Sequence, residues 1–147
     1  MSTVTFTIVG KPCGKGRPKF ARRGEYVTTY TPEKTVNYES LVKFVWVQSG
    51  GEKLHGAIGA SFVSHFPIPK SESKKKRAEM DGEWYTKKPD CDNIEKIILD
   101  ALNGIAYDDD SQVAKQSSEK IYDAEETMVE VTLYELGSRK QSKGGVT

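Results

Sequence analysis

Apolar residues that alternate with polar ones predict strands near both ends of the chain and in its middle. Valine, phenylalanine and isoleucine alternate with threonine over residues 3–9, and a period of two is typical of a half-buried strand. Residues 57–66 and 127–136 show the same alternation. We expect residues 120–123 to pair with residues 127–136 as a hairpin that closes the fold.

Two longer stretches carry apolar residues at helical spacing. Thr31 and Pro32 suit an N-cap and a first helical position, which predicts a helix that ends at about Gln48. Residues 93–102 place isoleucine, alanine and leucine on one face, and Gly104 ends the pattern. The second helix is therefore expected to bury one face.

These elements predict a protein of the α/β class, α+β type, in which helices cover a mixed β-sheet. A chain of 147 residues with 36% hydrophobic residues has a suitable size for one core. We expect one domain over residues 1–136 and a flexible C-terminal tail over residues 137–147. No stretch approaches a membrane span and no signal segment is recognised, so we expect a cytoplasmic protein without a membrane partner.

The distribution of charge is more informative than its sum. The formal net charge is +1, which by itself does not indicate nucleic-acid binding. Residues 11–43 contain eight basic and three acidic residues, whereas residues 108–126 contain two basic and seven acidic ones. Such polarity suits an enzyme that attracts a polyanion with one surface and holds metal ions with another.

Basic residues gather in a glycine-rich loop over residues 11–23 and in residues 70–80, where Ser71 could cap a short helix. Phosphate contact is the functional interpretation, and an ordinary solvated surface is the alternative for each residue. The candidates for DNA contact are Lys15, Arg17, Lys19, Arg22, Arg23, Lys74, Lys75, Lys76 and Lys88.

Three aromatic residues, Phe20, Tyr26 and Tyr30, flank the glycine at position 24. We expect them to pack under a short hairpin that turns at Gly24, with stacking on bases as the alternative. This hairpin would follow the basic loop directly.

The residues best suited to a metal-binding or catalytic site lie between Asp90 and Asp110. Asp90 and Asp92 are two residues apart, so on an extended segment their side chains point to the same face. Lys96 follows Asp92 by about one helical turn. The chain then reverses after the helix, so Asp109 or Asp110 can return beside Asp90 and Asp92. Carboxylates aimed at one point suit a hard cation such as Mg²⁺, which leaves positions for phosphate oxygens.

Capping is the structural alternative for part of this pattern. Asp92 as N-cap with Glu95 three residues later matches a capping box. That interpretation leaves Asp90 unexplained. Asp100, one turn after Lys96, is expected to pair with that lysine or to reach toward it.

Cysteine and histidine are too few and too scattered for a zinc site. The chain has two of each, and the two cysteines, Cys13 and Cys91, form no C-x-x-C motif. We expect free thiols, with Cys91 packed inward on the opposite face of its strand.

Three separated blocks of the sequence resemble the motifs of the RusA family of Holliday-junction resolvases, small endonucleases common in phages and prophages. The blocks are Pro89-Asp90-Cys91-Asp92-Asn93 with Lys96, Asp100-Ala101-Leu102-Asn103-Gly104, and Asp109-Asp110-Ser111-Gln112-Val113. They occur in the family's order and cover about a sixth of the chain. The block Gly16-Arg17-Pro18-Lys19-Phe20 is also similar to one found in many members, which usually carry arginine at position 19.

The resemblance implies a compact RusA-like domain in which Lys96 assists one or two Mg²⁺ ions per subunit, with Mn²⁺ as an alternative metal. The implied metal ligands are Asp90, Asp92 and Asp110, and Asp109 is the alternative to the last. It also implies a bacterial or phage-encoded homodimer that resolves four-way junctions and related branched DNA in recombination and repair. Symmetric paired nicks would leave a 5′-phosphate and a 3′-hydroxyl.

Two other functions stay open at this point. A restriction-type nuclease shares the proline, the aspartates and a lysine, but its usual acidic-x-Lys ending is missing because Glu95 directly precedes Lys96. A non-catalytic nucleic-acid-binding phage protein would use the basic segments and leave the acidic turn without a catalytic role.

Overall fold

The fold is built on a strand that is paired along both of its edges. In the computed structural model, which describes residues 1–140 apart from the Arg23 side chain, four strands form one sheet in the order β1-β6-β4-β5. The strand β4 is antiparallel to β6 and parallel to β5, so the predicted mixed sheet is confirmed. The strands are β1 (Thr3–Val9), β4 (Ile58–Pro67), β5 (Val113–Asp123) and β6 (Met128–Glu135).

The predicted closing hairpin is wrong. β5 and β6 follow one another along the chain, but β4 lies between them in the sheet. The chain leaves β4 and crosses the sheet through a helix before it returns, and such a crossover places the next strand parallel to the first. β5 therefore occupies the outer edge of β4, and β6 fills the remaining place between β4 and β1.

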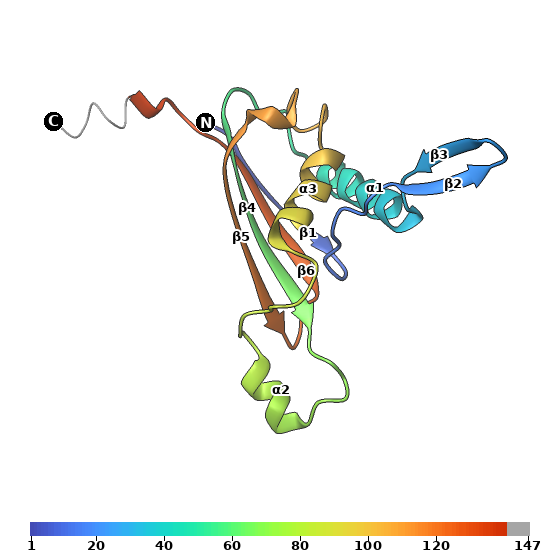
Figure 1. Cartoon of the computed structure of the whole chain (residues 1–147). Helices are drawn as coiled ribbons and strands as arrows, with labels where there is room; N and C mark the ends of the chain where they lie inside the picture. Colours follow the sequence, from blue (N-terminus) through green and yellow to red (C-terminus); the bar gives the residue numbers. More distant parts are fainter. Residues whose placement is uncertain (141–147) are drawn as a thin grey trace.

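Two helices, α1 (Glu33–Gln48) and α3 (Cys91–Ala101), cover one face of this sheet (Figure 1). Ile94, Ile97 and Ile98 of α3 are fully buried, as the helical spacing predicts. The N-cap of α1 is Pro32 and not the expected Thr31, and it provides no side-chain cap.

The other face of the sheet is polar, which explains why apolar residues alternate in the strands. Thr5 and Thr132 approach with their hydroxyl groups 3.3 Å apart on neighbouring strands, and the Ser117 hydroxyl donates to the Ser61 hydroxyl at 3.2 Å. An antiparallel or mixed sheet commonly keeps one face on the core and one in water. The elements that concern function accordingly gather on the side of α1 and α3.

Two small elements project from the ends of this body (Figure 1). The hairpin of β2 (Lys19–Arg23) and β3 (Tyr26–Tyr30) turns at Gly24, whose φ of +63° favours glycine. The hairpin is confirmed, but its aromatic residues do not pack beneath it. Their exposed fractions are 74% for Phe20, 77% for Tyr26 and 51% for Tyr30, because no other part of the described chain lies over this hairpin.

The helix α2 (Lys74–Met80) lies beyond the end of β4 (Figure 1). Its cap is Ser73 and not the expected Ser71, because the Lys76 backbone N–H donates to the Ser73 hydroxyl at 3.1 Å. Arg77 donates to the carbonyls of Ile68 and Pro69 and ties α2 to the end of β4.

Among the described residues no helix is both long enough and apolar enough to cross a lipid bilayer. Of the predicted C-terminal tail, residues 141–147 lie outside the part of the chain that the structure describes.

Replacement of Phe62 by alanine should lower the free energy of unfolding by about 3–5 kcal/mol, because this fully buried ring fills the centre of the core. Urea denaturation followed by circular dichroism measures the change. The control Thr7→Ala, at an exposed position of β1, should stay within about 0.5 kcal/mol of the wild type. Equal losses for both variants would contradict this description of the core.

Candidate active site

Helix α3 presents its polar residues to an open cavity. Asp92, Lys96 and Asp100 are spaced by four residues, so their side chains lie on one face of the helix while the isoleucines pack into the core. The cavity has a volume of about 500 Å³ and is lined by Asp92, Glu95, Lys96, Leu99, Asp100, Asp110 and Gln116. Four carboxyl groups and one ammonium group therefore share a single depression; we call it the acidic cavity.

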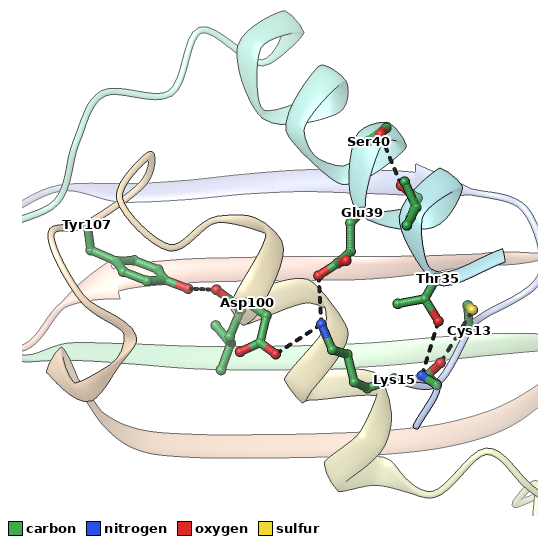
Figure 2. Close-up of polar contacts among 11 residues, drawn as sticks. Cys13, Lys15, Thr35, Glu39, Ser40, Asp100 and Tyr107 are labelled. Atoms are coloured by element: carbon green, nitrogen blue, oxygen red, sulfur yellow. Dashed lines mark hydrogen bonds and ion pairs between the residues drawn. The ribbon is translucent and has the colours of Figure 1, made fainter. Parts of the chain in front are cut away.

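Asp110 reaches the acidic cavity because the chain turns back after α3. The Asp110 backbone N–H donates to Asn103 Oδ1 at 3.1 Å, and the buried Tyr107 hydroxyl donates to the Leu99 carbonyl at 2.5 Å (Figure 2). These bonds hold the returning segment against the end of α3. The carboxyl group of Asp110 consequently shares the acidic cavity with that of Asp100, which helps to raise the pKa of Asp110.

The neighbouring aspartates, Asp108 and Asp109, have partners outside the acidic cavity. Asp108 pairs with Lys53 at 2.5 Å, and this contact lowers the pKa of Asp108. Asp109 accepts hydrogen bonds from the side chain and the backbone N–H of Ser111, which lower the pKa of Asp109 and cap the short 3₁₀ turn Asp110–Gln112. Of the three consecutive aspartates, Asp110 is the one that lines the cavity.

The carboxyl groups inside the cavity are crowded. Burial, followed by the charges of Asp109 and Asp100, raises the pKa of Asp110 above its usual value. Burial and the charge of Asp92 likewise raise the pKa of Glu95. Raised carboxyl pKa values mean that the negative charges are poorly compensated here. A cation placed among them would relieve this repulsion.

A lysine from the basic loop compensates one of these charges (Figure 2). The Lys15 ammonium lies 3.0 Å from Glu39 Oε2 on α1 and 3.3 Å from Asp100 Oδ2 on α3. Partial burial by itself lowers the pKa of Lys15, but the hydrogen bonds and charges of the two carboxylates outweigh it and the pKa is raised. Asp100 therefore pairs with Lys15. Of the two possibilities for Asp100, the ion pair with Lys96 is wrong, and the two side chains line the same cavity without forming one.

The physical reason lies in helix geometry and in the reach of the loop. A lysine that precedes an aspartate by four residues is the less favourable order on a helix. Lys15 approaches from a different segment and meets no such restriction. Among the residues that the structure describes, Lys96 takes part in no ion pair, so its charge stays available in the acidic cavity.

Two glycines let the basic loop pack closely against the first turns of α1 and α3. A Cβ atom on Gly14 would lie 2.8 Å from Pro89 Cβ, and one on Gly16 would lie 2.6 Å from Thr35 Oγ1. The Lys15 backbone N–H also donates to the Asn93 carbonyl at 3.1 Å. The loop is thus held in place by backbone contacts as well as by its ion pairs.

Asp90 lies on the other side of the start of α3. The segment from Cys91 is helical, with Asp90 as N-cap, so the expected extended segment with Asp90 and Asp92 on one face is wrong. The interpretation of Asp92 as N-cap is wrong for the same reason. Cys91 lies on this helix, half-buried, and not on a strand.

Asp90 lines a second groove of about 670 Å³ together with the basic loop, and this groove includes Lys11, Lys15, Arg17, Lys34 and Lys88. A phosphate group in this groove would meet several ammonium groups and a guanidinium group beside Asp90. In residues 1–140, no three histidine, cysteine, aspartate or glutamate side chains are already grouped closely enough to hold a metal ion. The implied ligands Asp90, Asp92 and Asp110 therefore remain a prediction.

The predicted DNA-contacting residues occupy three separate places. Arg17 and Lys88 line the second groove, Lys19 and Arg22 are exposed on the hairpin, and Lys74–Lys76 are exposed on α2 (Figure 1). Arg23 belongs to β2, and its side chain is outside the described residues. The Lys15 ammonium faces carboxylates, and its contact with DNA stays a prediction.

Three residues of this region were not predicted from the sequence as site residues. Glu95 and Gln116 line the acidic cavity. Lys120 donates to the carbonyls of Lys87 (2.7 Å) and Pro89 (2.9 Å) and so fixes the segment that leads into Asp90. In β5, Gln116 and Lys120 pair with the buried Ala60 and Ser64 of β4 and therefore lie on the inward side of the sheet, which the strand predicted over residues 120–123 did not indicate for Gln116.

Comparisons with known proteins identify the family of this chain. The family model for the endodeoxyribonuclease RusA matches residues 10–134. A protein of Bacillus subtilis (strain 168), named uncharacterized protein YqaN, is 36% identical over 143 residues, which cover 94% of this chain and all of that protein. The chain belongs to the RusA family of endodeoxyribonucleases, and this membership places it among the hydrolases that cleave DNA.

The opposite pKa shifts of Asp110 and Asp109 predict opposite effects of two similar substitutions. A raised carboxyl pKa makes ionisation unfavourable for the folded state, so without metal Asp110→Asn should gain stability over the wild type as pH rises above 3.8. Asp109 has a lowered pKa, so its ionised form contributes stability that is lost as pH falls. Asp109→Asn should therefore be less stable than the wild type at neutral pH.

Chemical denaturation of both variants in EDTA, over a series of pH values from 3 to 8, measures these differences. Because the two residues are adjacent, each variant serves as the control for the other. The same sign of change in both at pH 7 would contradict the described environments.

Proposed function

We propose that this protein is a Mg²⁺-dependent endonuclease that resolves four-way DNA junctions by paired nicks. The observation that carries the proposal is the acidic cavity, in which crowded carboxyl groups lie beside a lysine without an ion-pair partner in the described chain. A basic loop borders the same helix. Negative groups for a cation and positive groups for a polyanion within one region suit hydrolysis of a phosphodiester.

The donor atoms fit Mg²⁺ in kind. Mg²⁺ prefers carboxylate oxygens and water. Burial, followed by the charges of Asp109 and Asp100, raises the pKa of Asp110, and a divalent cation would offset the repulsion between these carboxylates. We propose Asp92 and Asp110 as ligands in the acidic cavity, with Asp90 turning toward them from the second groove and Asp109 as the alternative to Asp110. When bound, one or two Mg²⁺ ions, or Mn²⁺ in their place, would supply an activated water and stabilise both oxygens of an in-line displacement.

The protein's own residues would bind and orient the substrate. Lys96 directs its charge into the acidic cavity, where it would attract the scissile phosphate and offset the charge that builds up on it. Arg17 and Lys88 would hold the neighbouring backbone in the second groove. The ion pair with Lys15 orients the Asp100 carboxylate at the wall of the acidic cavity before DNA arrives.

We further propose that the protein acts as a homodimer in DNA recombination and repair. Two like strands must be cut across a four-way junction, and a twofold dimer offers two sites in the matching symmetry. The exposed lysines of α2 and the basic residues of the hairpin, which lie toward different ends of the molecule (Figure 1), would contact separate arms of a branched substrate. Hydrolysis would leave ligatable nicks with 5′-phosphate and 3′-hydroxyl ends.

Two alternative functions predict different behaviour toward DNA. A restriction-type nuclease would cut linear duplex as well as it cuts a junction. A non-catalytic nucleic-acid-binding protein would bind junctions equally well in EDTA and would tolerate the loss of Asp92.

Asp92→Asn and Asp110→Asn should each reduce cleavage of a labelled four-way junction by at least about 100-fold and leave junction binding intact. The measurement uses Mg²⁺, with linear duplex of the same sequence alongside. Asp108→Asn, at the aspartate paired with Lys53 outside the cavity, is the matched control and should retain activity. Paired nicks that persist in Asp92→Asn would remove this residue from the mechanism, and equal cutting of duplex would favour the restriction-type alternative.

Reversal of charge on α2 tests the DNA contact of that helix. The triple variant Lys74→Glu, Lys75→Glu and Lys76→Glu should weaken junction binding at least about tenfold and make it less dependent on salt, because fewer counterions are released. Binding is measured by fluorescence anisotropy between about 50 and 200 mM salt. Lys115→Glu, at an exposed position of the uncovered sheet face, is the control. Unchanged binding of the triple variant at low salt would exclude contact through α2.

A further inference from the structure

Lys120 is a charged residue on the inward side of the sheet. It pairs in register with the buried Ser64 of β4, on the side that the helices cover. Among the residues that the structure describes, Lys120 takes part in no ion pair. A partly buried charge is costly unless hydrogen bonds compensate it, so the partners of this ammonium group indicate what it holds.

The partners of Lys120 are two backbone carbonyls just before α3. Its ammonium donates to the Lys87 carbonyl at 2.7 Å and to the Pro89 carbonyl at 2.9 Å, and it lies 5.5 Å from the centre of the Tyr85 ring. Two of the three donors of the ammonium are therefore used on one short piece of chain. Hydrogen bonds from charged donors are stronger than neutral ones, so Lys120 anchors this piece firmly.

The chain before α3 depends on this anchor. Residues 82–89, which we call the entry segment, lead from α2 to α3 past the end of β5 (Figure 1). Its first half is bonded to the edge of β5, where the Tyr85 N–H donates to the Lys120 carbonyl at 2.9 Å. In the described chain, residues 86–89 take part in no backbone–backbone hydrogen bond. Side chains hold this second half, since the Tyr85 hydroxyl donates to the Lys88 carbonyl at 3.2 Å and Lys120 binds the carbonyls on either side.

The hydrogen bond to the Pro89 carbonyl fixes the backbone of Asp90. The peptide group between Pro89 and Asp90 is planar, so the direction of the Pro89 carbonyl also sets the plane that contains the Asp90 Cα atom. On the other side, the Asp90 carbonyl accepts a hydrogen bond from the Ile94 N–H at 3.1 Å in the first turn of α3. Both peptide groups of Asp90 are thus held, which leaves rotation of the side chain as the main freedom of its carboxylate.

We propose that Lys120 is a positioning residue, which places the Asp90 carboxylate for metal binding by holding the Pro89 carbonyl. The inference rests on the proposed function, in which Asp90 turns from the second groove toward the ligands in the acidic cavity. Lys120 is not among the described residues that line either of these cavities, so its effect reaches the site through the entry segment.

Strand β5 links this anchor to Asp110. Asp110 lies in the 3₁₀ turn that leads directly into β5, Gln116 lines the acidic cavity, and Lys120 follows four residues later on the same side of the strand. β5 pairs with β4 without interruption from residue 115 to residue 123. A strand held in this way keeps a fixed distance between the turn of Asp110 and the anchor of Asp90.

Removal of the ammonium group tests the proposal. Lys120→Met keeps the length of the side chain and loses its charge and donors. The dissociation constant of Mn²⁺ for the DNA-free protein should rise at least about tenfold, measured by electron paramagnetic resonance of the free ion, because Asp90 is no longer held. The kcat for junction cleavage with Mg²⁺ should fall about 100-fold. Lys120→Arg, which keeps the charge and the donors, should restore the Mn²⁺ affinity to within about threefold of the wild type.

A double-mutant cycle separates positioning from a general loss of stability. If Lys120 acts through Asp90, Lys120→Met should weaken Mn²⁺ binding in the wild type and add no further loss in Asp90→Asn. Lys115→Met, at an exposed lysine on the uncovered face of the same strand, is the matched control and should leave metal binding and cleavage unchanged. Circular dichroism and urea denaturation of every variant measure whether the fold is retained.

A wild type that binds no Mn²⁺, equal Mn²⁺ affinity in the wild type and Lys120→Met, or equal losses from Lys120→Met with and without Asp90 would overturn the proposal. Weaker junction binding in EDTA beside an unchanged Mn²⁺ affinity would assign Lys120 to DNA contact instead. The proposed function fails separately. A protein that binds Mn²⁺ in the expected dependence on Lys120 and Asp90 but nicks no junction would leave the positioning role standing and reject the nuclease, and an active nuclease that is indifferent to Lys120→Met would do the reverse.

Discussion

The ammonium group of Lys15, which lies between Glu39 of α1 and Asp100 of α3, is the interaction on which the arrangement of the site depends. It joins a loop without regular structure to the two helices that cover the sheet. Partial burial of a charge costs free energy that an opposite charge offsets, so removal of the ammonium would leave two carboxylates uncompensated. One side chain therefore holds the basic loop in position and lessens the repulsion at the edge of the acidic cavity.

Charge is separated over short distances on the helix-covered side of the sheet. The carboxyl groups of the acidic cavity follow one face of α3 from Asp92 to Asp100 and continue at Asp110. The basic groups lie in the second groove before α3, on the hairpin and on α2. The opposite face of the sheet carries mostly threonine, serine and isolated charges. A protein with a net charge of only +1 can attract a polyanion in this way, because local fields and not the net charge guide a charged ligand near the surface.

The periodic patterns of the chain predicted most of its elements. β1, β4, the hairpin, α1 and the buried face of α3 were all expected within a few residues, because each is set by local alternation of apolar and polar groups. The wrong predictions concern features that depend on contacts between segments distant in the sequence. The pairing of β5 with β4 instead of β6 depends on the crossover through α3, and the first residues of that helix were taken for a strand because Asp90 and Asp92 suit both interpretations.

The sequence by itself determined the mixed sheet, the family motifs and the residue types of the site, since these depend on periodicity and on short spacings. Only the tertiary structure decided which carboxyl groups share a cavity. Asp110 enters it and Asp109 does not, because hydrogen bonds to Asn103 and Ser111 orient the two neighbours differently. Lys15 and Asp100 are 85 positions apart and meet only because the loop after β1 packs across α1 onto α3. Such contacts arise from the packing of whole elements, which no local pattern of side chains records.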